Sequence, residues 1–190
     1  MSDQNRFLTN QFLIAMPALA DPNFFHSVTY ICEHTSEGAM GIVINKPLEL
    51  RLDEILHHMK IPVTGRRPTE LPVFLGGPVQ PERGFIVHER ERDREWENTI
   101  TITDELAVTT SRDILEDIAS DNGPRKLIVA LGYAGWGPGQ LEREMSENAW
   151  LSCPSDRHVL FDTPSEQRWE AAAALLGVDL NLLSNDVGHA

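Results

Sequence analysis

The densest group of residues that could bind a ligand is the stretch LGYAGWGPGQLEREM, from Leu131 to Met145. Four glycines and a proline lie between Gly132 and Gly139, after an apolar run and before a helical pattern. Glycine lets a ligand approach the backbone, and a helix N-terminus presents free N–H groups to an anion. The stretch lacks the Lys-Ser/Thr of a P-loop and the glycine spacing of a dinucleotide-binding motif. Corner turning and close strand–helix packing explain the same glycines without a ligand, so both interpretations stay open.

Two other turn motifs could lie beside this stretch. Apolar runs end at Asn45-Lys46-Pro47, at Gly76-Gly77-Pro78 and at Gly135-Trp136-Gly137. If these strands are sheet neighbours that run the same way, their carboxyl ends form a crevice, where α/β sheets bind ligands. Positive charge, a stacking face and helix-start amides would then converge on a small, modestly charged ligand or a partner's peptide. The predicted binding residues are Asn45, Lys46, Gly76, Gly77, Arg83, Gly135, Trp136, Gly137 and Gln140.

Catalytic signatures are missing from the sequence. It contains no G-x-S-x-G elbow, no H-E-x-x-H and no EF-hand loop. Cys32 and His34 would share one face of a regular strand, which could place a thiolate beside a base. The same face carries Val28 and Tyr30, however, and a buried structural cysteine explains the pattern better. We therefore predict no catalytic residue; the alternative is a small enzyme that acts on an anionic metabolite.

Metal binding is a weak alternative elsewhere. Helical spacing pairs Asp53 with His57 and Glu54 with His58, and each pair could share a metal ion. The spacing places no third ligand, and ordinary helix-surface pairs explain the pattern better. We predict no metal and no cofactor.

The run ERERDREWE, Glu89–Glu97, alternates in charge. In an extended chain Arg90, Arg92, Arg94 and Trp96 would share one face, which could bind an anion or stack on a ring. A solvated edge whose charges discourage aggregation is the favoured interpretation.

The composition indicates one acidic globular domain. The chain has 190 residues, of which 41% are hydrophobic, and a net charge of −13. A negative protein repels nucleic acid and anionic membranes at long range, so we predict that it binds neither directly. The two cysteines, Cys32 and Cys153, have no metal-binding spacing and fit a reducing cytosol.

The segment FLIAMPALA, Phe12–Ala20, has the A-x-A ending of a secretory signal. The preceding MSDQNR carries one acid and one base, and Pro17 interrupts the apolar run. We therefore expect a buried first strand and a cytoplasmic protein.

Apolar periodicity predicts the elements that position these residues. The predicted helices cover Leu52–Met59, a segment from the cap Ser111 to Ala119, a segment with Pro138 in its first turn, and a segment from the capping box at Thr163 to Gly177. Strands in runs, with helices interspersed irregularly, predict an α+β fold with a mixed sheet in one domain. The predicted strands are Phe12–Met16, Ser27–Glu33, Met40–Asn45, Val73–Gly77, Gly84–Glu89, Thr99–Thr103, Leu106–Thr109, Lys126–Ala134 and Arg157–Asp162.

Three stretches closely resemble the YqgE/AlgH family of bacterial proteins: FLIAMPALADPNFFHSVTYICEHTSEGAMGIVINKP, VFLGGPVQPERGFIVH and GPRKLIVALGYAGWGPGQLEREMSENAWL. The similarity runs from about Phe7 to Gly177 in unchanged order. The resemblance implies one domain over residues 1–190, with a core at about 7–177 and less ordered ends. It also implies a folded-over, barrel-like sheet flanked by helices, in a cytosolic protein.

The resemblance implies no reaction, because this family is largely uncharacterised. The AlgH name is associated with transcriptional regulation of alginate synthesis. We therefore expect a regulatory or accessory protein that binds an unidentified protein partner or small molecule. An effect on transcription would be indirect, because the sequence has no recognisable helix-turn-helix and a pI near 4.9.

Overall fold

The computed structural model describes residues 7–185, with side chains through residue 183. The predicted less ordered ends fall largely on residues 1–6 and 186–190, which lie outside this range. The described strands are β1 (Gln11–Ala15), β2 (Val28–Thr35), β3 (Gly38–Val43), β4 (Pro47–Arg51), β5 (Pro72–Leu75), β6 (Val79–Glu89), β7 (Thr99–Thr101), β8 (Leu106–Thr109), β9 (Leu127–Trp136) and β10 (Trp150–Pro154). The described helices are α1 (Leu52–His58), α2 (Arg112–Ala119), α3 (Gln140–Ser146), a π-helix (His158–Asp162), a 3₁₀ turn (Ser165–Gln167), α4 (Arg168–Ala174) and α5 (Leu180–Asn185).

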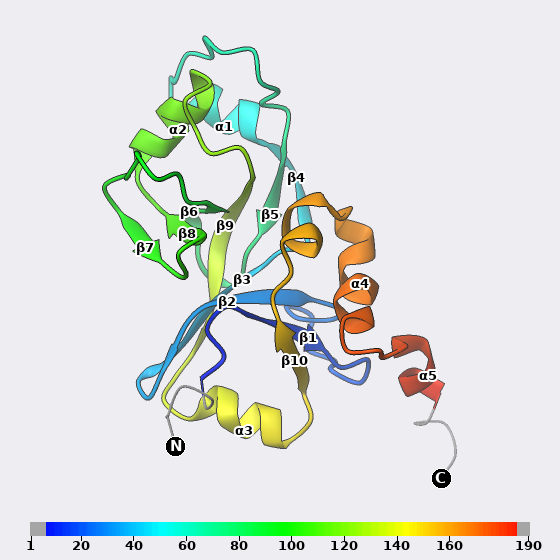
Figure 1. Ribbon diagram of the computed structural model, residues 1–190. Coiled ribbons are helices and arrows are strands. Elements are labelled where there is room, and N and C mark those ends of the chain that lie inside the picture. Colours follow the sequence, from blue (N-terminus) through cyan, green and yellow to red (C-terminus); the bar gives the residue numbers. More distant parts are fainter. Residues whose placement is uncertain (1–6, 186–190) are drawn as a thin grey trace.

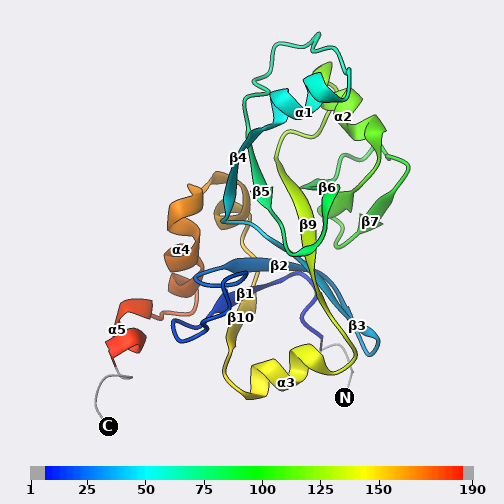
Figure 2. The same cartoon turned by 180° about the vertical axis from the view of Figure 1, so that it is seen from behind.

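One strongly curled sheet organises the domain (Figures 1 and 2). Its strand order is β10-β1-β2-β3-β9-β6-β8-β7, and β5 pairs with both β9 and β4. The β5–β9 pair is parallel and the other pairs are antiparallel. The α+β prediction, with a mixed and folded-over sheet in a single domain, is therefore confirmed.

Strand β9 joins the two halves of the curled sheet. Its first part pairs with β6, and its last residues, Ala134–Trp136, pair with Ala39–Gly41 of β3. In Figure 1 it runs from the α1–α2 end of the molecule down past β3. Residues of β9 therefore contact both halves of the sheet.

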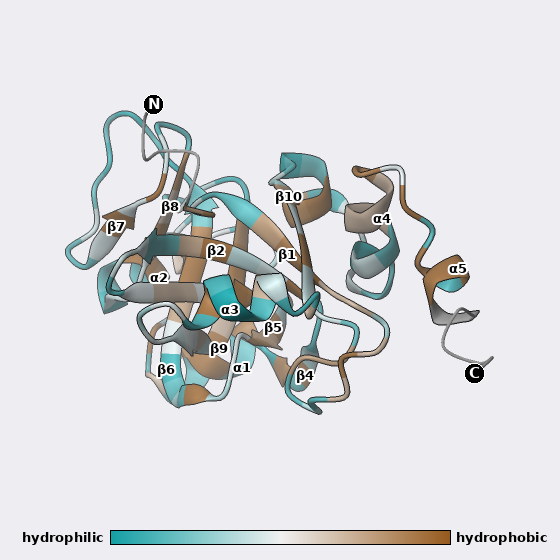
Figure 3. Cartoon of the chain, turned by 90° about the horizontal axis from the view of Figure 1, so that it is seen from below, coloured by the Kyte–Doolittle hydropathy of each residue, from teal (hydrophilic) through white to brown (hydrophobic). Residues whose placement is uncertain are grey.

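Alternation along the strands divides the apolar residues between one inner core and two outer ones. Phe85 and Val87 of β6 point into the inner core, whereas Ile86 points to the outer core beneath α1 and α2. In β1, Phe12 and Ile14 face the inner core. Leu13 and Ala15 face the other way and belong to the outer core that includes Leu141 of α3. Figure 3 shows α3 crossing the outer face of the sheet near β2. The helix α4 and the π-helix contribute to the inner core.

Most of the predicted elements are present. The first part of the segment considered as a possible signal, Phe12–Ala15, lies in β1, which pairs with β2 on one side and β10 on the other. The helix α1 matches its predicted start, and Ser111 occupies the N-cap of α2 as predicted. Its hydroxyl donates to Asp113 and makes no capping hydrogen bond.

The predicted strand Arg157–Asp162 is wrong, since this segment forms the π-helix. Val159 and Leu160 are both buried in the inner core, and two consecutive inward residues suit a helical turn better than a strand. Asp156 accepts a hydrogen bond from the N–H of Val159 at 2.9 Å and so starts the turn. The predicted capping box is also wrong, because the Thr163 hydroxyl donates to the carbonyl of His158.

Candidate functional site

The open side of the curled sheet contains a cavity of about 960 Å³, here called the groove. Its walls come from the β2–β3 hairpin, from β6 and β7, and from the last residues of β9. Arg83, Gly135 and Trp136, all predicted binding residues, line it together. The groove is therefore our candidate binding site.

Arg83 supplies positive charge to the groove. Its guanidinium carbon lies 5.6 Å from the centre of the Phe85 ring, and Nη2 donates to the Thr110 hydroxyl at 3.2 Å. Phe85 in turn meets Tyr133 edge to face, with 5.5 Å between the ring centres. Within the described chain, Arg83 forms no ion pair. It is an exposed, oriented cation available to an anionic group.

Three carboxylates face the same cavity. Glu33 and Glu37 come from the β2–β3 hairpin, and Glu97 precedes β7. All three are exposed, and none forms an ion pair with another described residue. The groove thus carries both signs of charge, with an excess of negative charge that favours basic groups.

Trp136 is less available than the sequence predicted. Only 6% of its surface is exposed, and its ring packs with Phe24 and Trp150, each at a centre-to-centre distance of 6.2 Å. Beside these indoles, burial raises the pKa of the Glu144 carboxyl. Trp136 serves mainly as a core residue that borders the groove.

The assumption that the three strands are neighbours running the same way is right for β5 and β9, which pair in parallel, and wrong for β3, which runs antiparallel to β9. Trp136 pairs with Ala39, at the start of β3, whereas Asn45 and Lys46 follow its end. Asn45 accepts a hydrogen bond from the N–H of Val28 and donates to the carbonyl of His26, both at 2.9 Å. It therefore fixes the loop before β2.

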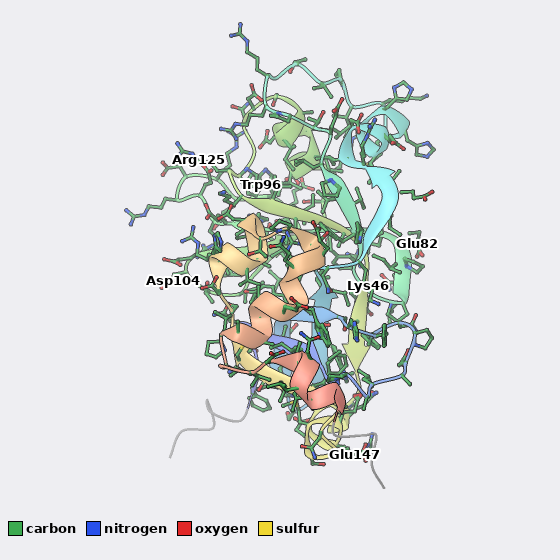
Figure 4. All side chains as sticks on the ribbon, turned by 90° about the vertical axis from the view of Figure 1, so that its right-hand side faces the viewer. Lys46, Glu82, Trp96, Asp104, Arg125 and Glu147 are labelled. Carbon is green, nitrogen blue, oxygen red and sulfur yellow. The ribbon has the colours of Figure 1, made fainter. Side chains whose placement is uncertain are left out.

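Lys46 lies on the side of the molecule that faces α4 (Figure 4). Its ammonium donates to the Phe25 carbonyl at 2.9 Å, next to a stack in which His26 lies 3.8 Å from Phe25 and 3.8 Å from Trp169. Burial lowers the pKa of Lys46. The structure does not bring Lys46 together with Arg83.

Gly76 and Gly77 are buried where their backbone closely approaches another backbone segment, in β9. A Cβ at Gly76 would lie 2.4 Å from the Gly132 carbonyl oxygen, and one at Gly77 would lie 2.1 Å from the Tyr133 carbonyl carbon. These contacts account for both glycines through backbone packing alone.

The start of α3 offers few free donors. Gln140 accepts the Gly137 N–H with its side chain at 3.0 Å and donates its own N–H to the Gly137 carbonyl at 3.1 Å. The N-cap is Gly139, with φ 74°, so Pro138 lies just before the helix and the prediction that placed it in the first turn is wrong. The N–H groups of Gly137 and Gln140, both predicted to bind a ligand, are therefore already used in this turn.

The hypothesised Cys32–His34 pair does not form. A bulge between Ile31 and Glu33 shifts the register of β2, so the two side chains leave opposite faces. Cys32 lies in the inner core, where burial raises its pKa to about 12. His34 instead contacts Glu142 of α3, with 2.9 Å between Nε2 and Oε1.

The charged run before β7 contacts α2 through two of its side chains. Trp96, labelled in Figure 4, is buried and donates its indole N–H to Asp117 at 2.9 Å. Arg94 pairs with the same carboxylate. These contacts give both side chains a structural role.

The histidines of α1 lie beside a second cavity. His57 and His58 border this cavity, of about 660 Å³, between α1 and α2. Residues 7–185 contain no cluster of three or more metal-ligating side chains. No helix in that range is long and apolar enough to cross a bilayer.

Sequence reasoning missed Tyr133 as a groove residue. Ile128 and Ala130 point into the inner core, so regular alternation would turn Tyr133 away from it. Gly132 adopts a φ of 75° at an irregularity between β6 and β9, which turns Tyr133 inward. A glycine inside a strand pattern is the available signal of such a bulge.

The comparisons with known proteins agree with the fold. A family model described as AlgH-like (DUF179) matches residues 12–181. A UPF0301 protein of Nitrosococcus oceani is 56% identical over 97% of both chains, and one of Thioalkalivibrio sulfidiphilus is 58% identical over 96% of both. The solution structure of the AlgH protein from Pseudomonas aeruginosa matches with a TM-score of 0.77 and 47% identity, covering 100% of both chains. A crystal structure from Corynebacterium diphtheriae, at 19% identity and a TM-score of 0.73, covers 93% of this chain and 91% of its own and shares the fold.

Proposed function

The chain belongs to the AlgH-like family, and on this premise we propose that it is a cytosolic regulatory or accessory protein that binds a ligand or partner in the groove. The observation that carries the proposal is Arg83, an exposed guanidinium oriented on the Phe85 ring without a carboxylate partner among the described residues. An oriented, unpaired charge in a concave surface loses little entropy when it binds an opposite charge.

Any effect on transcription is proposed to be indirect. A net charge of −13 opposes contact with the phosphates of DNA, whose neutralisation supplies most of the affinity of DNA-binding proteins. The enzyme alternative has less support, because Cys32 is buried away from His34 and Lys46 lies apart from Arg83.

Native mass spectrometry of the protein isolated from its own cells tests this proposal. We expect a bound metabolite or partner on the wild type and at least about tenfold less of it on Arg83→Ala, the loss expected for one charge-assisted hydrogen bond. Arg125→Ala is the matched control, because Arg125 is also exposed but does not line the groove. The same occupancy in all three proteins, or no bound species, contradicts the proposal.

A further inference from the structure

Strand β7 is at one end of the sheet and has an unpaired edge. Backbone hydrogen bonds join Asn98 and Ile102 to the β8 side. Because the direction of the backbone polar groups alternates along a strand, Thr99 and Thr101 must direct their N–H and C=O groups away from β8. These groups form a short template for another strand.

The groove borders this edge. The four consecutive residues Glu97–Ile100 all line the cavity, so it meets the backbone edge as well as one face of the strand. Ile100 is 44% exposed and so offers an apolar surface beside this edge. Across the cavity stands the β2–β3 hairpin with Glu33 and Glu37.

We propose that the groove binds an extended, basic peptide segment of a partner protein, which adds to β7 as a further strand. This inference rests on the proposed binding function and names the class of its ligand. The peptide pairs with the free groups of Thr99 and Thr101, and every second side chain enters the groove. There an apolar side chain packs on Ile100, Lys or Arg side chains meet the carboxylates of Glu33 and Glu37, and one carboxylate of the otherwise basic peptide pairs with Arg83.

Charge decides between this occupant and a second copy of the chain. Two copies that paired their β7 edges would bring together two chains that each carry a net charge of −13. Repulsion between these like net charges opposes such pairing. A basic segment instead gains from Glu33, Glu37 and Glu97, which lack ion-pair partners among the described residues.

The test uses a random decapeptide library displayed on phage and selected against the wild-type protein. We expect the enriched peptides to alternate apolar residues with Lys or Arg. Synthetic copies should protect the Thr99 and Thr101 amides from hydrogen exchange and give cross-strand NOEs to β7. Methylation of the peptide nitrogens that face β7 should weaken binding at least about tenfold, because each removes one backbone hydrogen bond.

A matched pair of variants separates strand addition from side-chain effects. Thr101→Pro removes an outward N–H and leaves the ladder to β8 intact, since proline is tolerated at such edge positions. Thr101→Val removes the hydroxyl and keeps the N–H. We expect Thr101→Pro to bind the peptides at least about tenfold more weakly and Thr101→Val to bind like the wild type. If Thr101→Pro does not fold, the methylated peptides decide the question on the wild-type protein.

Failure of this inference is distinguishable from failure of the binding function. Selection of acidic or patternless peptides, or equal binding by Thr101→Pro and Thr101→Val, overturns strand addition. If native ligand occupancy still depends on Arg83 in that case, the groove remains a binding site for another class of ligand. If occupancy does not depend on Arg83 either, both proposals fail.

Discussion

The imidazole of His34 joins β2 to α3 through Glu142, with 2.9 Å between His34 Nε2 and Glu142 Oε1. The other ring nitrogen, Nδ1, accepts the Leu8 N–H at 3.0 Å. Because Nδ1 is an acceptor, Nε2 carries the proton and donates it to the carboxylate. Both ring nitrogens of this buried histidine are therefore used in structural hydrogen bonds.

The first prediction concerns this connection. His34→Ala should lower the free energy of unfolding by about 2–3 kcal/mol, because it leaves the Leu8 N–H without its partner and opens a cavity. Glu142→Gln should cost less than about 1 kcal/mol, since its amide oxygen can still accept from Nε2. Urea denaturation measures both values. Equal losses for the two variants would contradict donation from His34 Nε2 to Glu142.

The second prediction concerns Arg168, a buried cation without an ion pair in the described structure. It donates to the carbonyls of Thr163 and Ile44 and lies over the Phe74 ring at 5.1 Å. Burial lowers its pKa to about 10, so the guanidinium stays charged at neutral pH. Arg168→Met should destabilise the protein by about 2–4 kcal/mol, because two buried carbonyls lose their donors.

Thermal and urea unfolding measure the effect of Arg168→Met. Arg125→Ala serves as the control, because Arg125 is an exposed arginine and its loss should change stability by less than about 0.5 kcal/mol. If the Arg168 variant is as stable as the wild type, the guanidinium does not connect α4 to the sheet in the way described.

The third prediction concerns pH and the two buried thiols. Burial raises the pKa of Cys32 to about 12 and that of Cys153 to about 11. Above pH 9 the unfolded chain loses these protons while the native state keeps them, so stability falls as pH rises toward 12. Each thiol should contribute a slope on the order of 1 kcal/mol per pH unit.

Comparison with Cys32→Ala isolates this contribution, because lysines and tyrosines titrate in the same range. The variant should lose stability less steeply between pH 9 and 11 than the wild type. Both cysteines are free, so thiol titration of denatured protein should also find two thiols. A parallel pH dependence of wild type and variant would show that Cys32 ionises normally in the native state.

Local patterns predicted the elements that depend on local sequence. The helix α1 begins at Leu52 as predicted, because its apolar spacing is helical. The strand β1 was also predicted, although its sequence resembles part of a secretory signal. The strand β10 was missed, since its five residues become a strand by pairing with β1, more than a hundred positions earlier. The C-terminal helix α5 was also missed.

The candidate site was only partly predictable, for two physical reasons. Strand direction is a property of the whole topology, and the antiparallel β3–β9 pair separates Lys46 from Trp136. Bulges, in turn, change which face a side chain occupies. The one in β2 turns His34 away from Cys32, and the irregularity at Gly132 turns Tyr133 into the groove.

The fourth prediction concerns duplex DNA. The pI of about 4.9 and the acidic groove should keep the dissociation constant weaker than about 100 μM at physiological salt, the weak limit for non-specific binding. Fluorescence anisotropy with a labelled duplex measures this binding. Sequence-dependent binding in the nanomolar range would contradict an indirect role in transcription.

The last prediction concerns Trp136, whose ring packs with Phe24 and Trp150 beneath the groove. Trp136→Ala should lower the free energy of unfolding by about 3–5 kcal/mol, because it empties a large buried volume beside α3. Trp136→Phe keeps much of that volume and should cost less than about 1.5 kcal/mol. Urea denaturation measures both variants.

If Trp136→Ala is as stable as the wild type but loses a groove ligand, Trp136 binds that ligand directly, as the sequence suggested. If both properties fall together, the indole acts through the core that supports the groove.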